Sequence, residues 1–123
     1  MARILLAGSD SASVDALAAE VEGEGHEARI ALTGQEAYEL ALELSPDLVI
    51  LETALSVFNG FETCQMIRSD PAIPSTLPVV LLSSVEPDRR QMDKVGATES
   101  LSKTHRAGDL RELLSRLLPA DAY

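Results

Sequence analysis

The stretch LVILETALSVFNGFE, residues 48–62, decides the fold that the sequence predicts. Its first four residues are continuously apolar, which is typical of a strand buried on both faces of a sheet. The run ends on one acid, Glu52, and Asn59 followed three residues later by Glu62 marks the start of a helix. The stretch therefore predicts one unit of an alternating strand–helix fold, with a carboxylate at the end of its strand.

The same alternation extends along the whole chain. Short runs rich in Val, Ile and Leu predict strands at 3–7, 27–31, 47–52, 78–83 and 99–102. Helices are predicted from apolar stripes at Val14–Val21, Ala37–Leu44 and Leu110–Leu117, from a less regular segment at Phe61–Ile67, and from a weak one at 88–95. A capping-box pattern at 33–36 marks the start of the second helix. Strands separated by helices pair in parallel, so we predict an α/β, (βα)5 doubly wound fold: a five-stranded parallel sheet with helices on both faces.

Composition limits the kind of protein. A chain of 123 residues fits a single domain, 1–123, in which 119–123 resemble the start of a linker. The net charge of −10 and the pI near 4.5 argue against direct nucleic-acid binding, which needs clustered cations. Cys64 is the only cysteine, which favours a reducing compartment without disulfides. No apolar run approaches membrane-spanning length, so we expect a cytoplasmic protein that does not enter a membrane.

The functional crevice of such a sheet lies beyond the carboxyl ends of its strands. Glu52 would reach this crevice from the third predicted strand. The residues that follow the other strands should converge there with it: Gly8, Ser9, Ser83, Ser84 and Lys103.

The chain resembles, from about residue 3 to 118, the CheY-like receiver domain of two-component response regulators. PDLVILE and NGFE (46–52 and 59–62) are similar to the segment that carries the family's phosphoacceptor aspartate. LPVVLLSS (77–84) resembles the strand that ends in the switch Ser/Thr, GATESLSK (96–103) the run that ends in the family's lysine, and RILLAGSD (3–10) the first strand with its acidic cluster. The resemblance implies a flavodoxin-like fold and Mg²⁺-dependent phosphorylation of an aspartate by a histidine kinase. It also implies a switched surface on the last helices and strand.

This sequence departs from the family pattern at the positions that carry out phosphorylation and bind Mg²⁺. Matched position by position, Glu52 replaces the phosphoacceptor aspartate, Gly8 and Ser9 replace the two Mg²⁺-binding acids, and Ser100 replaces the switch aromatic, whereas Ser83 and Lys103 match. Thr104 stands where the family has a proline that usually follows a cis bond. Because a cis bond before another residue costs about 2.5–4 kcal/mol, we expect a trans Lys103–Thr104 bond and a shifted loop.

The charges that remain in the expected pocket are consistent with the replacement of its acids at positions 8 and 9. Mg²⁺ requires hard oxygen ligands, and with Gly8 and Ser9 in place Glu52 is the only sure carboxylate. We therefore predict that Glu52 pairs with Lys103 and that no metal binds. Asp10 is the acid that could restore a metal site, but capping the first helix is the more ordinary role for it.

Plain structural roles remain open for these residues. Glu52 could be a strand-end acid without function, Lys103 a surface lysine, and Ser83 a serine bonded to its own backbone. His105 could bond at the pocket rim, although a solvated loop histidine is the more common case. His26 is expected to be structural, and Cys64 is expected to pack in the core.

Three functions are compatible with the sequence. The first is an atypical receiver, or pseudo-receiver, in two-component-type signal transduction, which acts as a phosphorylation-independent protein–protein interaction module, with no catalytic residue and no cofactor. The second is a receiver that still takes phosphate from a histidine kinase. The third is a small-ligand binder on the same scaffold.

A basic surface on an acidic chain suggests where a partner binds. In the resembling family this surface comprises helix 4, strand 5 and helix 5. Its cations here are Arg89, Arg90, Lys94, Arg106 and Arg111. The expected partner is a signalling protein, another domain of a longer regulator, or a second copy in a homodimer; a merely solvated helix face is the alternative.

Overall fold

The computed structural model describes residues 1–122. Within them, parallel strands form one five-stranded sheet in the order β2-β1-β3-β4-β5. The chain moves outward from β1 to β2 and then crosses back to β3, so the strand order reverses between β1 and β3. The strands are β1 (Arg3–Ala7), β2 (Glu27–Ala31), β3 (Leu48–Glu52), β4 (Val79–Ser83) and β5 (Glu99–Ser102).

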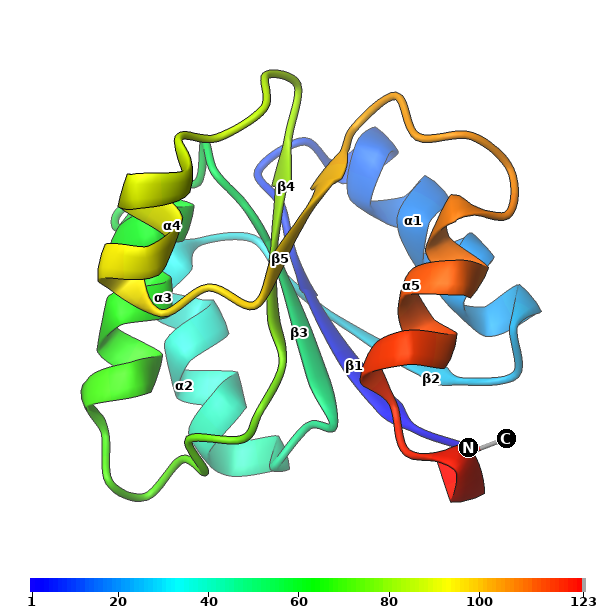
Figure 1. Ribbon diagram of the computed structural model, residues 1–123, viewed down its shortest axis with the longest axis horizontal. Helices are drawn as coiled ribbons and strands as arrows, with labels where there is room; N and C mark the ends of the chain where they lie inside the picture. The colour runs from blue at the N-terminus through cyan, green and yellow to red at the C-terminus, as the bar shows by residue number, and fades with distance from the viewer. Residues whose placement is uncertain (123) are drawn as a thin grey trace.

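Helices cover both faces of the sheet. Figure 1 shows α1 and α5 on one side and α2, α3 and α4 on the other. The predicted doubly wound α/β fold is therefore confirmed. The helices are α1 (Ser11–Gly23), α2 (Gly34–Leu44), α3 (Gly60–Ser69), α4 (Arg89–Val95) and α5 (Asp109–Leu117).

The central strands are apolar throughout because the sheet has two cores. Alternate residues of a strand point to opposite faces. Leu6 and Ile50 pack into the cluster under α1 and α5, whereas Leu5 and Leu51 pack into the cluster under α2, α3 and α4. All four side chains are at most 1% exposed. Burial on both faces is what the continuous apolar run of β3 predicted.

The helix starts follow the predicted capping signals. Asn59 and Glu62 form a complete capping box, in which the Asn59 side chain accepts from the Glu62 N–H at 2.8 Å and the Glu62 side chain accepts from the Asn59 N–H at 2.9 Å. The Thr33 hydroxyl accepts from the Glu36 N–H at 3.1 Å. Such caps satisfy N–H groups that have no partner inside the helix.

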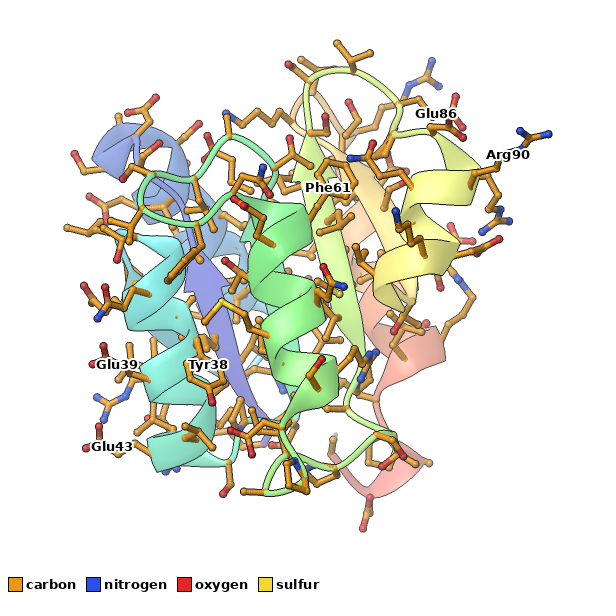
Figure 2. All side chains as sticks on the ribbon, turned by 90° about the vertical axis from the view of Figure 1, so that its left-hand side faces the viewer. Tyr38, Glu39, Glu43, Phe61, Glu86 and Arg90 are labelled. Carbon is orange, nitrogen blue, oxygen red and sulfur yellow. The ribbon has the colours of Figure 1, made fainter. Side chains whose placement is uncertain are left out.

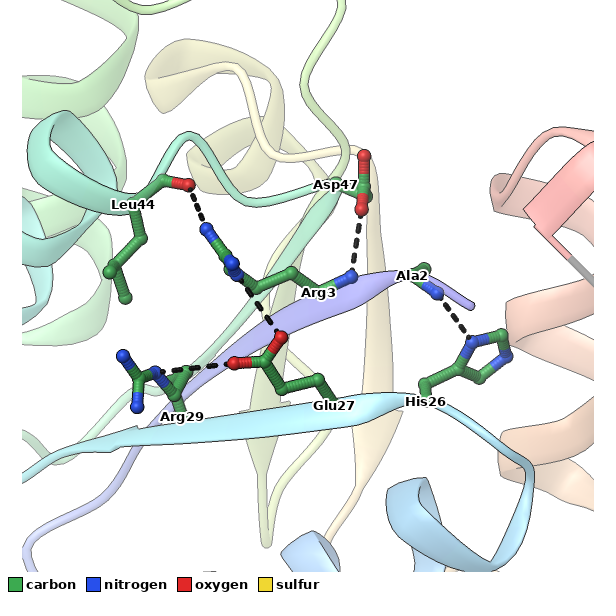
Figure 3. A network of polar contacts seen from close by, with 7 residues as sticks. All are labelled: Ala2, Arg3, His26, Glu27, Arg29, Leu44 and Asp47. Carbon is green, nitrogen blue, oxygen red and sulfur yellow. Dashed lines mark hydrogen bonds and ion pairs between the residues drawn. The ribbon is translucent and has the colours of Figure 1, made fainter.

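A polar network closes the amino edge of the sheet, opposite the predicted crevice (Figure 3). The Arg3 guanidinium lies 3.3 Å from Glu27 Oε2 and donates to the Leu44 carbonyl at 2.9 Å. The Arg3 N–H donates to Asp47 Oδ2 at 2.7 Å. Arg3 therefore ties β1 to β2 and to the connection between α2 and β3.

Two further polar residues have structural positions, as expected. His26 is buried, and its Nδ1 accepts from the Ala2 N–H at 3.0 Å (Figure 3). Cys64 is fully buried under the α2–α3–α4 layer, and burial raises the pKa of its thiol to about 11. A thiol with so high a pKa carries almost no reactive thiolate near neutral pH.

The end of the chain packs back on the domain. Leu118 is buried, residues Ala120–Ala122 form a short 3₁₀ helix, and Ala122 contacts the core under α1 and α5. The predicted linker start at 119–123 includes residue 123, which lies outside the described residues. Among residues 1–122, no helix has both the length and the apolar character needed to cross a membrane.

The loop between β3 and α3 touches the start of α2 backbone to backbone. A Cβ atom on Gly34 would lie only 2.0 Å from the Phe58 carbonyl oxygen, and the Gly34 N–H donates to the Ser56 carbonyl at 3.1 Å. Within this loop Val57 has a φ of 69°, which is rare for a β-branched residue. Gly34 thus holds the loop that leads away from Glu52.

Replacing Gly34 tests this close approach. We expect Gly34→Ala to lower the free energy of unfolding by about 2 kcal/mol or more, because the new methyl group meets backbone that cannot yield cheaply. Gly23→Ala is the matched control: nothing lies within 4 Å of its added Cβ. We expect that control to be neutral or stabilising by about 0.5–1 kcal/mol. Equal stability of the two variants in urea unfolding would contradict the packing described.

Candidate functional site

Glu52 is the buried acid of the carboxyl edge. It ends β3, and its side chain is 5% exposed. The Lys103 ammonium donates to Glu52 Oε1 at 2.8 Å, while the Lys103 N–H donates to the Ser83 carbonyl at 2.9 Å. The ion pair that the sequence favoured is therefore present and connects the ends of β3 and β5, while the backbone bond to Ser83 adds the end of β4.

Gly8 provides the space for the second oxygen of this carboxylate. A Cβ on Gly8 would lie 2.8 Å from Glu52 Oε2 and 3.3 Å from the Val14 Cβ. Gly60 leaves similar space on the backbone side, where an added Cβ would lie 2.6 Å from the Glu52 carbonyl oxygen. The carboxylate thus fills the place that a side chain at position 8 would need.

The other residues after β1, Ser9 and Asp10, have hydrogen-bond partners other than Glu52. Ser9 is exposed, and its hydroxyl lies 3.5 Å from the Ala54 carbonyl. Asp10 caps α1, with Oδ1 accepting from the Ala12 N–H at 3.1 Å. Capping was the ordinary role expected for Asp10.

The chemistry of these residues does not suit Mg²⁺. The ion needs several hard oxygen ligands in near-octahedral geometry. One oxygen of Glu52 is already held by Lys103, and Gly8 offers no side chain. Within residues 1–122, no group of three or more His, Cys, Asp or Glu side chains is placed to hold a metal ion.

The two serines matched to the switch positions lie apart from each other. The Ser83 hydroxyl accepts from the Val85 N–H at 3.2 Å, so it is bonded within its own loop. Ser100 is half-buried in the edge strand β5 and lines a pocket of about 230 Å³ with Glu86, Pro87, Arg89, Met92 and Glu99. The small side chain of Ser100 leaves this pocket open beside α4.

The predicted surface cations lie on α4, on α5 and in the loop before α5. Arg89, Arg90 and Lys94 are exposed on α4. Arg111 lies on α5, across the sheet from α4, and its Nε donates to both oxygens of Glu24 at the end of α1, at 2.9 and 3.1 Å. Arg106 is exposed in the loop before α5. The interaction surface on α4, β5 and α5 stays a prediction, and of its cations Arg111 is ion-paired within the domain.

His105 was expected to be a solvated loop histidine, but its side chain is only 10% exposed. Its Nδ1 lies 2.9 Å from the Ser102 carbonyl oxygen, and its Nε2 lies 2.8 Å from Glu20 Oε2 on α1. Both neighbours are acceptors, so only the imidazolium can donate to both. Burial lowers the pKa of His105, but the hydrogen bonds to Glu20 and Ser102 outweigh burial and raise it above its ordinary value of 6.5.

The sequence contains little that could have revealed the His105 contact. Glu20 and His105 are 85 residues apart, and each looks like an ordinary exposed residue in its own segment.

The Lys103–Thr104 bond is trans, as the sequence predicts. The loop that contains Lys103 and Thr104 is held against α1 by the contact between His105 and Glu20.

The sequence matches a known protein family and several curated relatives. Residues 4–115 match the family described as the response regulator receiver domain. The DNA-binding dual master transcriptional regulator RpaA of Synechocystis sp. is 32% identical over 119 residues, which are 95% of this chain and 48% of RpaA. Response regulator PleD of Caulobacter vibrioides is 32% identical over 104 residues, which are 83% of this chain and 23% of PleD. The chain spans about half of RpaA and about a quarter of PleD.

Solved structures share the fold. Chemotaxis protein CheY4 of Vibrio cholerae superposes with a TM-score of 0.89 at 24% identity, over 96% of this chain and 99% of CheY4. Response regulator TrrA of Thermotoga maritima, solved in complex with Mg²⁺ and BeF, superposes with a TM-score of 0.86 at 27% identity, over 96% of this chain and 100% of TrrA.

Removing the cation from the buried pair should destabilise the protein. Lys103→Met preserves most of the side-chain length but leaves Glu52 buried without its partner. We expect the free energy of unfolding to fall by about 2 kcal/mol. This is less than the roughly 3–5 kcal/mol for a fully buried pair, because the Lys103 side chain is 27% exposed. Urea unfolding measures the change.

Two further variants control this experiment. Lys94→Met removes an exposed lysine of α4 and should change stability by no more than about 0.5 kcal/mol. Glu52→Gln combined with Lys103→Met should recover part of the loss, since it also removes the buried charge. A Lys103→Met protein as stable as the Lys94→Met protein would show that the pair contributes nothing.

The His105–Glu20 contact should make stability depend on pH. Because folding raises the pKa of His105, its stabilisation is complete below about pH 6.5 and is lost as the pH rises through the folded value. The stability difference between wild type and His105→Gln should therefore shrink between pH 6 and pH 8.5, approximate limits that bracket the ordinary histidine value. Arg111→Gln removes a guanidinium whose pKa the hydrogen bond to Glu24 raises further, so it stays charged throughout this range and should show a constant difference. A constant difference for His105→Gln would contradict the imidazolium assignment.

Proposed function

The chain belongs to the response regulator receiver domain family, and we propose that it is a receiver that signals without being phosphorylated. In this proposal it acts by binding a protein partner or other domains of a longer regulator, and it catalyses no reaction. The observation that carries the proposal is the fit between Glu52 and Gly8, since a Cβ at position 8 would lie 2.8 Å from Glu52 Oε2.

The steric fit has an electrostatic counterpart. An acid at position 8 would place a second carboxylate against Glu52 in a buried site, where like charges repel strongly. Glu52 instead neutralises Lys103, and its Oε2 lies against the place where a side chain at position 8 would begin. This supports a pocket maintained as a fixed ion pair.

The geometry also disfavours phosphate transfer to Glu52. One oxygen of the carboxylate that would attack a phosphoryl group accepts a hydrogen bond from Lys103, and the other lies beside Gly8, which offers no side chain. Phosphoryl transfer depends on positioning and on charge neutralisation by metal ions. The residues around Glu52 do not supply a ligand set for such an ion.

The proposal extends only to this domain. RpaA is described as DNA-binding, but RpaA is about twice as long as the region matched here. We propose that this chain does not bind nucleic acid directly, because its net charge is −10. The cations of α4 remain a predicted partner surface, whereas Arg111 on α5 is already paired to Glu24 at the end of α1.

A titration with Mg²⁺ followed by beryllofluoride tests the proposal. Beryllofluoride stands in for the phosphoryl group, and backbone amide NMR shifts of Glu52, Ser83 and Lys103 provide the readout. We expect no site-specific shift at millimolar Mg²⁺ or after beryllofluoride is added. TrrA, which was solved with both, is the positive control. Saturable shifts around Glu52 would overturn the proposal.

A variant in which the acids of the family pattern are restored provides a second test. Gly8→Asp, Ser9→Asp and Glu52→Asp together shorten the acid of β3 and add carboxylates at the two matched positions. We expect this triple variant to show Mg²⁺-dependent shifts that the wild type lacks. Glu52→Asp alone is its matched control and should not respond, because it adds no ligand.

A further inference from the structure

The outer face of α2 and α3 contains a groove that neither the Glu52 pocket nor the α4 surface explains. One depression of about 370 Å³ is lined by Tyr38, Met66, Ser69, Asp70 and Pro71. A second, of about 360 Å³, is lined by Phe58, Glu62, Gln65, Met66 and Ser69. The two share Met66 and Ser69, so they adjoin along α3. We call them together the α2–α3 groove.

The groove contains aromatic side chains that are scarce elsewhere in the chain. The sequence has two Phe, two Tyr and no Trp. Of these, Tyr38 and Phe58 line the groove, and both are half-buried rather than enclosed in the core. Figure 2 shows Tyr38 between α2 and α3. Half-exposed aromatic and Met side chains are the types enriched where proteins bind one another.

The charged residues that line the groove are acidic. Glu62 and Asp70 line it, and none of the lining residues is a Lys or Arg. Figure 2 shows Glu39 and Glu43 on the side of α2 that faces away from α3, so they add negative charge near the groove without lining it, and α2 has no basic residue. The one cation of α3, Arg68, is turned toward α4, where its Nε donates to the Gly96 carbonyl at 2.8 Å. The groove is therefore apolar at its floor and negative at its sides.

We propose that the α2–α3 groove binds a basic amphipathic helix of a partner protein. The apolar face of such a helix would lie on Tyr38, Phe58 and Met66, and its Lys or Arg side chains would reach the surrounding carboxylates. The ten residues of α3 span about 15 Å at 1.5 Å per residue, which accommodates about three turns of a bound helix.

Other occupants fit the charge less well. Acidic walls repel both the phosphate backbone of nucleic acids and anionic lipid surfaces. A second copy would bring its own acidic groove against this one. The cations of α4 offer no apolar anchor to a second copy, because Met92 and Val95 are buried. A basic partner helix satisfies both the apolar floor and the acidic sides.

This proposal rests on the proposed function only in that an interaction module needs a docking face. Its test is separate, since the groove lies on the outside of α2 and α3 and its lining does not include Glu52 or Lys103. A failure of peptide binding would leave the Mg²⁺ and beryllofluoride result unaffected, and a response to beryllofluoride would leave the groove unaffected.

Fluorescence anisotropy with a labelled helical peptide of Leu and Lys tests the groove. The control peptide has the same Leu positions with Glu in place of Lys. We expect saturable binding of the Leu/Lys peptide and at least about tenfold weaker binding of the Leu/Glu peptide. No binding of the Leu/Lys peptide at about 1 mM, a concentration that detects even weak complexes, would overturn the proposal.

Charge changes at one exposed groove position locate the contact. Gln65 lines the groove, is exposed and has room for a charged group, so Gln65→Lys should weaken binding about fivefold and Gln65→Glu should strengthen it. Ala19→Lys and Ala19→Glu make the same charge changes on the exposed face of α1, across the sheet, and should each change affinity less than about twofold. Equal effects at positions 65 and 19 would mean diffuse attraction to an acidic protein and would overturn the proposal.

A substitution at the apolar floor of the groove distinguishes binding of a protein helix from binding of a membrane. Met66→Gln should weaken the Leu/Lys peptide about tenfold, because it places an amide under the apolar face of the helix. The protein should not pellet with neutral phosphatidylcholine vesicles. Vesicle binding that Met66→Gln abolishes would assign the groove to a lipid surface and overturn the helix proposal.

Discussion

Burial of β3 on both faces is the constraint on which the rest of the site depends. Its apolar run is enclosed by two cores, so the acid at its end enters a region with little water. A carboxylate there requires a nearby cation, because a buried charge without a partner is strongly unfavourable. Lys103 supplies that cation from the loop after β5 and thereby joins the central and edge strands at their carboxyl ends.

Two glycines make this arrangement possible. Gly8 leaves room for one oxygen of Glu52, and Gly60 allows the start of α3 to lie against the backbone of the same residue. Glu52 is therefore enclosed from the side of β1 and from the side of α3, while Lys103 approaches the remaining oxygen. Positions 8 and 52 are structurally coupled, since the Glu52 carboxylate occupies space that a side chain at position 8 would need.

The fold and the central pair could be predicted because their signals are local. Apolar periodicity locates the strands and helices, and parallel order brings the strand ends of Glu52 and Lys103 to the same edge. The contacts that escaped prediction depend on which helix covers which face of the sheet. Arg111 pairs with Glu24, and His105 pairs with Glu20, because α5 and its preceding loop lie beside α1. The bond of the Ser83 hydroxyl within its own loop, by contrast, is the ordinary backbone role that the sequence left open for this serine.

The close fit of Gly8 to Glu52 also restricts how this protein can evolve. An aspartate at position 8 alone would collide with Glu52 Oε2 and set two carboxylates together in a buried place. An aspartate at position 52 alone would shorten the reach to Lys103 and gain no metal ligand in return. Each single step toward a phosphorylatable pocket crosses a less stable intermediate. For a receiver that signals without phosphorylation, as proposed, a return to a metal-binding pocket would require positions 8 and 52 to change together.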